Sequence, residues 1–447
     1  MGFIRGEGRT QLSMFPMTLE ELVPADHMCR VIEAFVERLD MEGLGFGRAE
    51  AAETGRPGYD PRDLLKLYLY GYFQQIRSSR RLEGECRRNV ELMWLLGRLA
   101  PDHKTIAEFR RMYGEAVTRA GVELVSFARS EGLIRGEWVA IDGTKFRAAS
   151  SFAAVRERKQ LEQYLAEMEA ADGGEEEVKI DASAVAAALE KLQRHPEPEA
   201  GFMRLAASSN KIPAYNVQTA VDSEQALIVA HEVSNEANDF RSLLPMAEAA
   251  RAAASDGTQP LHVVADVGYS SGEQAEACEA QGIVTHVAAK RGVNASGDGT
   301  LFDRTEFHYD EGSDSYRCPA GQTLLRRQLS RRDRMIVYTG QPEVCGACGL
   351  KSRCTVGAQR TVKRHLHEAA LERMQQRATP ETMRLRRSIV EHPFATLKYH
   401  IFGHPRFLLR GLKGARAEIG LGVMVYNLKR MINILGGCRL CERLAQA

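Results

Sequence analysis

Two aspartates follow short apolar runs, at positions where a buried strand is expected to leave its sheet. Asp142 follows WVAI and Asp266 follows HVVA. A metal-dependent phosphoryl-transfer site needs several carboxylates, because two divalent cations about 4 Å apart must be held by oxygen ligands. A lone aspartate at a strand end is more often a turn or capping residue, but two in neighbouring strands favour such a site. Asp222 and Asp239 are competing carboxylates, and the segment SNEANDF predicts that Asp239 caps the following helix.

A third candidate carboxylate lies in the segment MRLRRSIVEHPFATLKYH. At about 100° per residue, one face of a helix here would carry one carboxylate among three cations. These residues are Arg384, Arg387, Glu391 and Lys398. The alternative interpretation is a solvated face with ordinary ion pairs. Pro393 should bend the helix just after Glu391, because proline lacks a backbone N–H donor.

Length and composition predict a globular protein of two or three domains. The chain has 447 residues, of which 44% are hydrophobic and 27% are charged. No apolar run reaches the roughly 20 residues that a membrane-spanning helix needs, and the first residues lack the apolar centre of a signal peptide. We therefore expect a cytoplasmic protein without a membrane partner.

The order of the predicted elements indicates a mixed α/β sheet preceded by helices. Residues 1–135 are predicted to be helical, with Pro61 after Asp60 at the start of a buried helix and Asp102 or Thr105 as the cap of another. Strand patterns begin at residue 138 and later alternate with helices. Strands are predicted over 138–142, 214–222, 226–234, 261–269 and 282–290, and helices over 240–254, 271–281 and 379–436.

Charge is distributed unevenly, although the net charge is only +1. Residues 157–200 carry 12 acidic and 5 basic side chains and are predicted to form a helical hairpin inserted between the first two strands. Residues 360–447 carry 17 basic and 6 acidic side chains. Aromatic residues interleave the basic ones, a mixture that suits contacts with DNA phosphates. The basic segment 77–89 predicts a second such surface, where Arg80 and Arg81 are expected to contact DNA.

Four of the nine cysteines cluster in a second insertion, at about residues 296–375. They are Cys318, Cys345, Cys348 and Cys354, and the middle two form a CxxC pair. Four thiolates in one insertion are typical of a structural, tetrahedral zinc site. Two alternatives stay open, namely reduced thiols in a loop and a site in which His365 or His367 is a ligand.

Taken in order, these motifs resemble those of the DDE transposases of bacterial insertion sequences. The matching segments are DGTKF at Asp142, ADVGYSS at Asp266, and R-x3-E-x6-K formed by Arg387, Glu391 and Lys398. The resemblance covers about residues 12–435, and the three carboxylates are separated by 123 and 124 intervening residues. One departure is Arg384, which stands where the family has a tyrosine.

The resemblance implies an RNase H-like catalytic domain in which the three carboxylates bind two Mg²⁺ ions, with Mn²⁺ as a possible substitute. One ion would activate water and then the freed DNA 3′-hydroxyl, and the other would stabilise the leaving oxygen. Arg387 and Lys398 would hold phosphates of the transposon end, with Lys145 and Arg384 as further DNA contacts. The implied partners are double-stranded DNA, as terminal inverted repeats and as target, and further copies of the chain.

The predicted domains follow from these features. They are a helical DNA-end-binding domain (1–135), a catalytic domain (136–295 and 376–436) with the acidic insertion (157–200), a Cys-rich insertion (296–375) and a tail (437–447). Two other functions stay open: a DNA-binding relic without catalysis, and an RNase H-like nuclease without strand transfer. The presence of Asp142, Asp266 and Glu391 argues against a relic without catalysis. Only the reaction product distinguishes a nuclease from a transposase.

Overall fold

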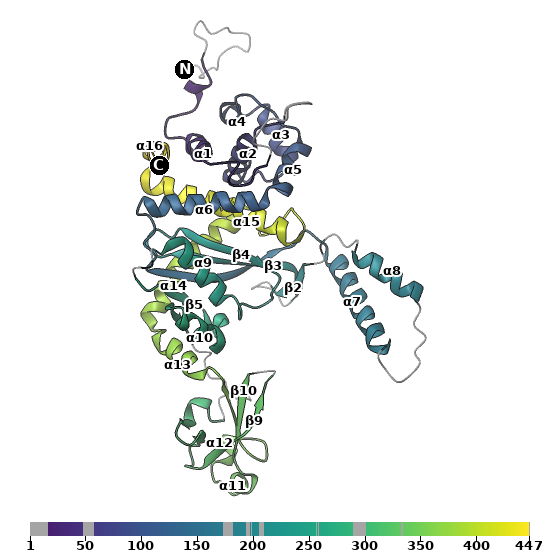
Figure 1. Cartoon of the computed structure of the whole chain (residues 1–447), viewed down its shortest axis with the longest axis vertical. Coiled ribbons are helices and arrows are strands. Elements are labelled where there is room, and N and C mark those ends of the chain that lie inside the picture. The colour runs from purple at the N-terminus through teal and green to yellow at the C-terminus, as the bar shows by residue number, and fades with distance from the viewer. Residues whose placement is uncertain are drawn as a thin grey trace, which may run out of the picture.

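The computed structural model shows a helical region, a mixed sheet with its helices, and a second, smaller sheet (Figure 1). It describes residues 17–47, 58–172, 182–193, 197, 199–204, 210–255, 257, 259–288, 301–331 and 334–446. Within these ranges, no helix has both the length and the apolar character needed to cross a membrane.

Short helices form the N-terminal region. They are η1 (Glu20–Leu22), α1 (Met28–Glu37), α2 (Pro61–Phe73), α3 (Ser79–Cys86), α4 (Val90–Leu95), α5 (His103–Met112) and α6 (Gly114–Ser130). The predicted start of α2 is confirmed, since Asp60 caps it and Pro61 is its first residue. Every residue of α2 from Leu64 onward is buried, as its dense apolar sequence predicts. Asp102 caps α5 by accepting hydrogen bonds from two backbone N–H groups.

A mixed sheet occupies the centre of the chain. Its strands are β1 (Trp138–Arg147), β2 (Gly201–Arg204), β3 (Lys211–Asp222), β4 (Ile228–Ser234), β5 (His262–Ala265) and β6 (Val284–Val287). The order is β2-β3-β1-β5-β6, and β4 also pairs with β3. β3 is antiparallel to β1, β2 and β4, whereas β1, β5 and β6 are parallel. The predicted mixed α/β class is confirmed, and helices α9 (Leu243–Ala254) and α10 (Gly272–Ala280) lie where they were expected.

Strand β1 runs further than the sequence predicts. The run WVAID was expected to leave the sheet at Asp142, but β1 continues along β3 to Arg147. On its other side, β5 ends at Ala265, and the parallel pairing stops at Ala140 and Val264. Asp142 is therefore inside a strand, yet it lies beyond the last residue pair that joins β1 to β5.

Helices from the end of the chain complete this domain. α14 (Pro380–Ala395) packs against β1, β3 and β5, and α15 (Gly411–Leu435) packs against β3 and β4. Figure 1 shows α6 and α15 side by side between the sheet and the other N-terminal helices. One hydrophobic core therefore continues from the N-terminal helices into the sheet. The segment expected to be a tail forms α16 (Gly437–Gln446), which packs against α1.

Two segments extend away from the central sheet (Figure 1). The acidic segment forms α7 (Phe152–Asp172) and α8 (Ala182–Gln193), which pack on each other, and the loop joining them lies outside the described residues. The Cys-rich segment contains an antiparallel sheet of order β11-β10-β9-β8-β7 rather than loops alone. Its elements are η3 (Arg304–Glu306), β7 (His308–Asp310), β8 (Ser315–Arg317), β9 (Thr323–Ser330), β10 (Met335–Thr339), α11 (Pro342–Gly346), α12 (Lys351–Cys354) and β11 (Thr361–His365). Helix α13 (Glu368–Arg377) then leads to α14.

Candidate functional site

Asp142 and Asp266 lie at the same edge of the mixed sheet. β1 and β5 are parallel neighbours, with Ala140 opposite Val264. Asp142 is two residues further along β1, and Asp266 directly follows the last residue of β5. The Asp266 side chain also accepts a hydrogen bond from the Gly268 N–H at 2.7 Å. Carboxylates from distant parts of the sequence are thus brought to one place by the parallel pairing.

The guanidinium of Arg386 interacts with both of these carboxylates. Its Nη2 is 2.8 Å from Asp142 Oδ1 and 3.7 Å from Asp266 Oδ2. The Asp142 side chain is 19% exposed and that of Asp266 is 44% exposed. Burial raises the pKa of Asp142 to about 6, while the positive charge of Arg386 opposes the rise. Neighbouring carboxylates destabilise each other's charged form, so this edge favours a bound cation.

Sequence reasoning missed Arg386. The charged stripe predicted for α14 passes through Arg384 and Arg387 and omits Arg386, one of the two residues between them. Arg386 precedes the buried Ile389 and Val390 by three and four residues, the spacing of one helix face. That face packs against β1 and β5. The apolar spacing is therefore the signal that identifies Arg386.

Asp239 belongs to the same cluster, and the prediction that it caps a helix is wrong. The N-cap of α9 is Ser242, three residues later. The Asp239 Oδ1 atom instead accepts hydrogen bonds from Asn216 Nδ2 at 2.7 Å, Gln218 Nε2 at 2.6 Å and Lys145 Nζ at 3.4 Å. These donors come from β1 and β3, which the tertiary structure places beside Asp239. The polar pair Asn216 and Gln218, alternating within a buried strand, is the sequence signal for this site.

Two glycines leave room for the cluster. A Cβ atom on Gly143 would lie 2.8 Å from Asp239 Oδ1, and one on Gly268 would lie 2.9 Å from Asp266 Oδ1. Both distances are too short for a side chain, so the glycines of the DGT and DVGY segments allow the carboxylates to approach the backbone.

The other competing carboxylate, Asp222, is not part of this cluster. It is fully buried at the opposite end of the β1–β3 pair, opposite Val139. Its oxygens accept backbone hydrogen bonds from Gly136 at 3.0 Å and Glu224 at 2.9 Å. Asp222 therefore stabilises the turns at that end of the sheet.

Glu391 lies on α14, the helix that carries Arg386. Its side chain is exposed. The ionic partner that Asp142 and Asp266 share is Arg386. The structure therefore places Glu391 on the helix that packs against both aspartate-bearing strands.

The helix changes its hydrogen-bonding pattern between Glu391 and Lys398. α14 contains Pro393 and ends at Ala395, and a π-helical turn, η4 (Thr396–Ile401), follows directly. Side chains after a π turn no longer follow α-helical spacing. Lys398 is half-buried, whereas Glu391 is exposed. Burial lowers the pKa of Lys398, and the nearby carboxylate of Asp142 raises it in part, so this lysine faces the aspartate cluster.

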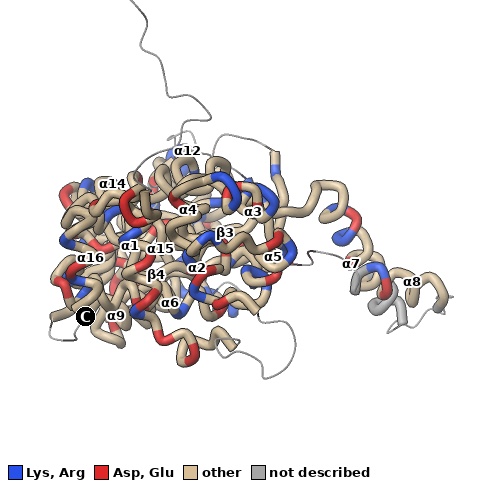
Figure 2. The backbone as a smooth tube through the Cα atoms, turned by 90° about the horizontal axis from the view of Figure 1, so that it is seen from above, with Lys and Arg blue, Asp and Glu red and all other residues tan. Residues whose placement is uncertain are grey.

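The remaining cations predicted to contact DNA are exposed. Arg384 and Arg387 lie on the outer face of α14. Arg80 and Arg81 lie on α3, where Figure 2 shows Lys and Arg gathered, and neither forms an ion pair with another described residue. Arg77, from the same basic segment, is instead bound to a buried glutamate.

The clustered cysteines lie in the turns and short helices that connect the strands of the second sheet. Cys318 follows β8, Cys345 is in α11, Cys348 follows α11, and Cys354 ends α12. All four are free thiols. Among the described residues, no three or more His, Cys, Asp or Glu side chains are arranged, as they stand, to hold a metal ion.

Two family models match the chain. One is described as a transposase DDE domain and matches residues 137–428, from the start of the mixed sheet into α15. The other is described as a transposase domain (DUF772) and matches residues 17–112, in the N-terminal helices. No curated protein matches the chain.

Proposed function

Because this chain belongs to the DDE transposases of insertion sequences, we propose that it cleaves DNA at the ends of its element and joins those ends to target DNA. The observation that carries the proposal is the pair of carboxylates just beyond the β1–β5 pairing, Asp142 and Asp266, around one positive charge. The family uses divalent metal ions. A phosphoryl-transfer site of this kind needs carboxylates grouped in one place.

The residues at this edge suit Mg²⁺, with Mn²⁺ as a substitute, because carboxylate oxygens are the ligands that both ions favour. Asp142, Asp266 and Glu391 would hold two such ions. When bound, these ions would polarise the phosphate and lower the pKa of the attacking water or 3′-hydroxyl. Glu391 is included because of its R-x3-E-x6-K motif and because α14 packs against both aspartate-bearing strands.

Arg386 competes with a metal ion for these carboxylates, since its guanidinium binds both of them. Replacing Arg386 with Ala is expected to raise the affinity for Mn²⁺ about tenfold in the absence of DNA, equal to about 1.4 kcal/mol. Calorimetric titration with Mn²⁺ measures this change. Arg384→Ala, on the exposed face of the same helix, is the matched control and should leave the affinity unchanged. An Arg386 variant that binds Mn²⁺ no more tightly than the control would contradict the competition.

The cations near the cluster are proposed to bind DNA phosphates, and they form a half-buried pair and an exposed pair. Lys145 and Lys398 are half-buried beside the carboxylates and would contact the phosphate that reacts. Arg387 and Arg384 are exposed on α14 and would hold the DNA next to it. A further set on α3, Arg80 and Arg81, would bind DNA away from the site.

Replacing Arg387 or Lys398 with Ala is expected to weaken DNA binding and to lower the slope of log K against log salt by about one unit for each lost phosphate contact. Fluorescence anisotropy with element-end DNA over a series of salt concentrations gives the slope. Arg439→Ala, at an exposed position on α16, is the control. If both variants keep the wild-type slope, neither Arg387 nor Lys398 contacts a DNA phosphate.

The strand arrangement supports an RNase H-like catalytic domain. Three antiparallel strands, β4, β3 and β1, are followed in the sheet by the parallel β5 and β6. We propose three parts of the chain: a helical domain that binds DNA ends (1–135), a catalytic domain (136–295 and 376–436) and a Cys-rich insertion (296–375).

Copies of the chain are also proposed to associate on DNA, because both ends of the element must be joined to the target. The sequence also predicts a zinc site, at the cysteines beside the second sheet. We assign zinc no role in the cleavage and joining of DNA.

One experiment separates this function from its alternatives. Purified protein is incubated with Mg²⁺, labelled DNA carrying the inverted repeats that flank its gene, and a target plasmid. A labelled product joined to the plasmid supports a transposase. Cleavage without joining indicates a nuclease, and binding without cleavage indicates a relic.

A further inference from the structure

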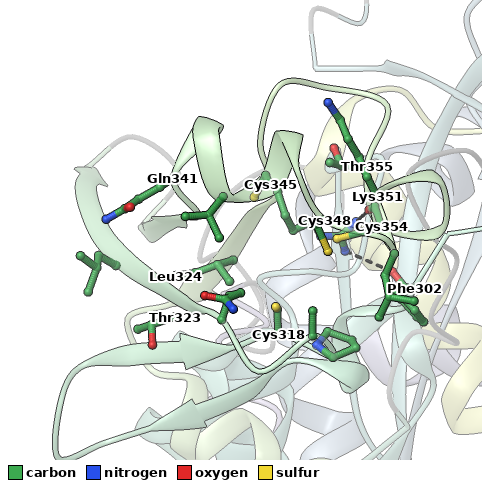
Figure 3. Close-up of a pocket in the computed structure, with 17 residues that line it drawn as sticks. Phe302, Cys318, Thr323, Leu324, Gln341, Cys345, Cys348, Lys351, Cys354 and Thr355 are labelled. Carbon is green, nitrogen blue, oxygen red and sulfur yellow. Dashed lines mark hydrogen bonds between the residues drawn. The ribbon is translucent and has the colours of Figure 1, made fainter.

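The four cysteines of the second sheet surround one cavity. Cys318 lines it from the β8–β9 turn, and Cys345, Cys348 and Cys354 line it from α11, α12 and the link between them. Figure 3 shows the four sulfur atoms around the same hollow. The turn at Cys318 is tight, since the Gly321 N–H donates to the Cys318 carbonyl at 2.8 Å. At the CxxC pair, the Cys348 N–H donates to the Cys345 carbonyl at 3.4 Å. Two short turns therefore present thiols to each other across the cavity.

We propose that Cys318, Cys345, Cys348 and Cys354 bind one zinc ion that joins these two turns. Zinc favours four thiolate ligands in tetrahedral arrangement, at Zn–S distances of about 2.3 Å. The described residues that line the cavity include no Asp, Glu or His, so the four cysteines are the side chains of the common zinc-ligand types among them. A sulfur-only set selects zinc over the hard ions Mg²⁺ and Ca²⁺. Binding requires the thiols to close on the space between them.

The charge around the cavity suits a thiolate site. Four thiolates around one Zn²⁺ carry a net charge of −2, which nearby cations must offset. Arg360 and Lys351 both line the cavity. The Arg360 guanidinium is anchored there by donating to the Cys354 carbonyl at 2.8 Å and to the Phe302 carbonyl at 3.2 Å.

The histidines considered as alternative ligands have other partners. His365 Nδ1 accepts a hydrogen bond from the His367 N–H at 3.1 Å. The imidazole of His367 contacts the carboxylate of Glu276 on α10. Neither histidine lines the cavity, so the structure favours the set of four cysteines.

The second sheet needs such a link because its own core is small. In the described residues, that core consists of five buried side chains: Phe307, Tyr316, Leu324, Tyr338 and Val362. Cys318 and Cys354 pack against its edge. Domains shorter than roughly 70–80 residues rarely gain enough stability from one core, and metal sites commonly supply the rest. Helices of five and four residues, α11 and α12, are also too short to be stable alone.

The test is metal analysis of the full chain, purified under reducing conditions from zinc-supplemented cells. We expect about one zinc per chain by mass spectrometry, and Co²⁺ exchange should produce a thiolate charge-transfer band with the intense visible bands of a tetrahedral site. The double variant Cys348→Ser/Cys354→Ser should lose the zinc and this spectrum. Cys438→Ser, an exposed cysteine in α16, is the matched control and should keep both.

Two further variants test whether zinc is bound by the cysteines. Cys354→His retains a ligand and should bind one zinc with an altered Co²⁺ spectrum, even if the double variant does not fold. Asp142→Asn should keep the zinc, which shows that the ion is not at the carboxylates. Wild-type protein that neither contains zinc nor takes it up on titration would overturn the proposal. So would a double variant that retains stoichiometric zinc. Neither result bears on the DNA-cleavage proposal, which is measured with Mg²⁺.

Discussion

Replacing Glu391 with Gln is expected to lower Mg²⁺-dependent cleavage of element-end DNA by about 10³-fold or more, with DNA binding within about twofold of wild type. Gln keeps the size and hydrogen-bonding capacity of Glu and removes the charge that a divalent ion requires. The side chain is exposed, so the substitution should change the free energy of unfolding by less than about 0.5 kcal/mol. Single-turnover cleavage and anisotropy binding on the same preparation measure the two effects.

The matched control is Glu381→Gln, in the first turn of the same helix. It removes the same charge from an exposed position ten residues earlier and should cleave at the wild-type rate. If Glu391→Gln cleaves normally, the third carboxylate is elsewhere. Asp239 is then the first residue to test, because it lies beside Gly143 and Gly268 in the same cluster.

Replacing Glu418 with Gln is expected to lower the free energy of unfolding by about 3–5 kcal/mol, because it leaves buried arginines without their counter-charge. Glu418 lies in α15 and is 0% exposed. Its carboxylate is 3.2 Å from Arg77 Nη1 and 3.9 Å from Arg110 Nη1, and it accepts backbone hydrogen bonds from Leu408 and Leu409 at 2.7 and 2.6 Å. The cluster thus ties the N-terminal helices to α15. Urea unfolding followed by circular dichroism and by fluorescence measures the loss.

Glu232→Gln is the control for this prediction. Glu232 pairs with Arg416 of the same helix α15 at 2.7 Å, but both side chains are about half exposed. Exposed pairs contribute about 0–1 kcal/mol, so this variant should unfold close to wild type. A Glu418 variant no less stable than the Glu232 variant would show that the buried cluster does not hold the two regions together.

The sequence predicted the elements of the fold well where local patterns decide them. The cap at Asp60, the proline after it and the dense apolar run are sufficient to identify α2. Apolar runs locate β1, β3, β4, β5 and β6 for a similar reason, because buried strands have few polar residues. The extent of β1 was not predictable, since it depends on how far β3 runs beside it.

The composition of the site was harder to predict than the fold. Motif order identifies Asp142, Asp266 and Glu391 as candidates, and their assignment as the catalytic carboxylates stays a prediction. The periodicity of apolar residues assigns a residue to one face of its own helix or strand. It does not identify the other elements that pack against that face. Arg386 and Asp239 were missed or misassigned for this reason, although the spacing around each contains a local signal.

The sequence by itself determined the family of this protein and the class of its fold, because both depend on the order and spacing of residues along the chain. Only the tertiary structure decided which charges meet. Arg386 binds the two aspartates because α14 packs on β1 and β5, and Asp239 joins them because β3 presents two amides beside it. Such contacts depend on strand register and on helix packing between segments that are separate in the chain, and a few ångströms of displacement would change them.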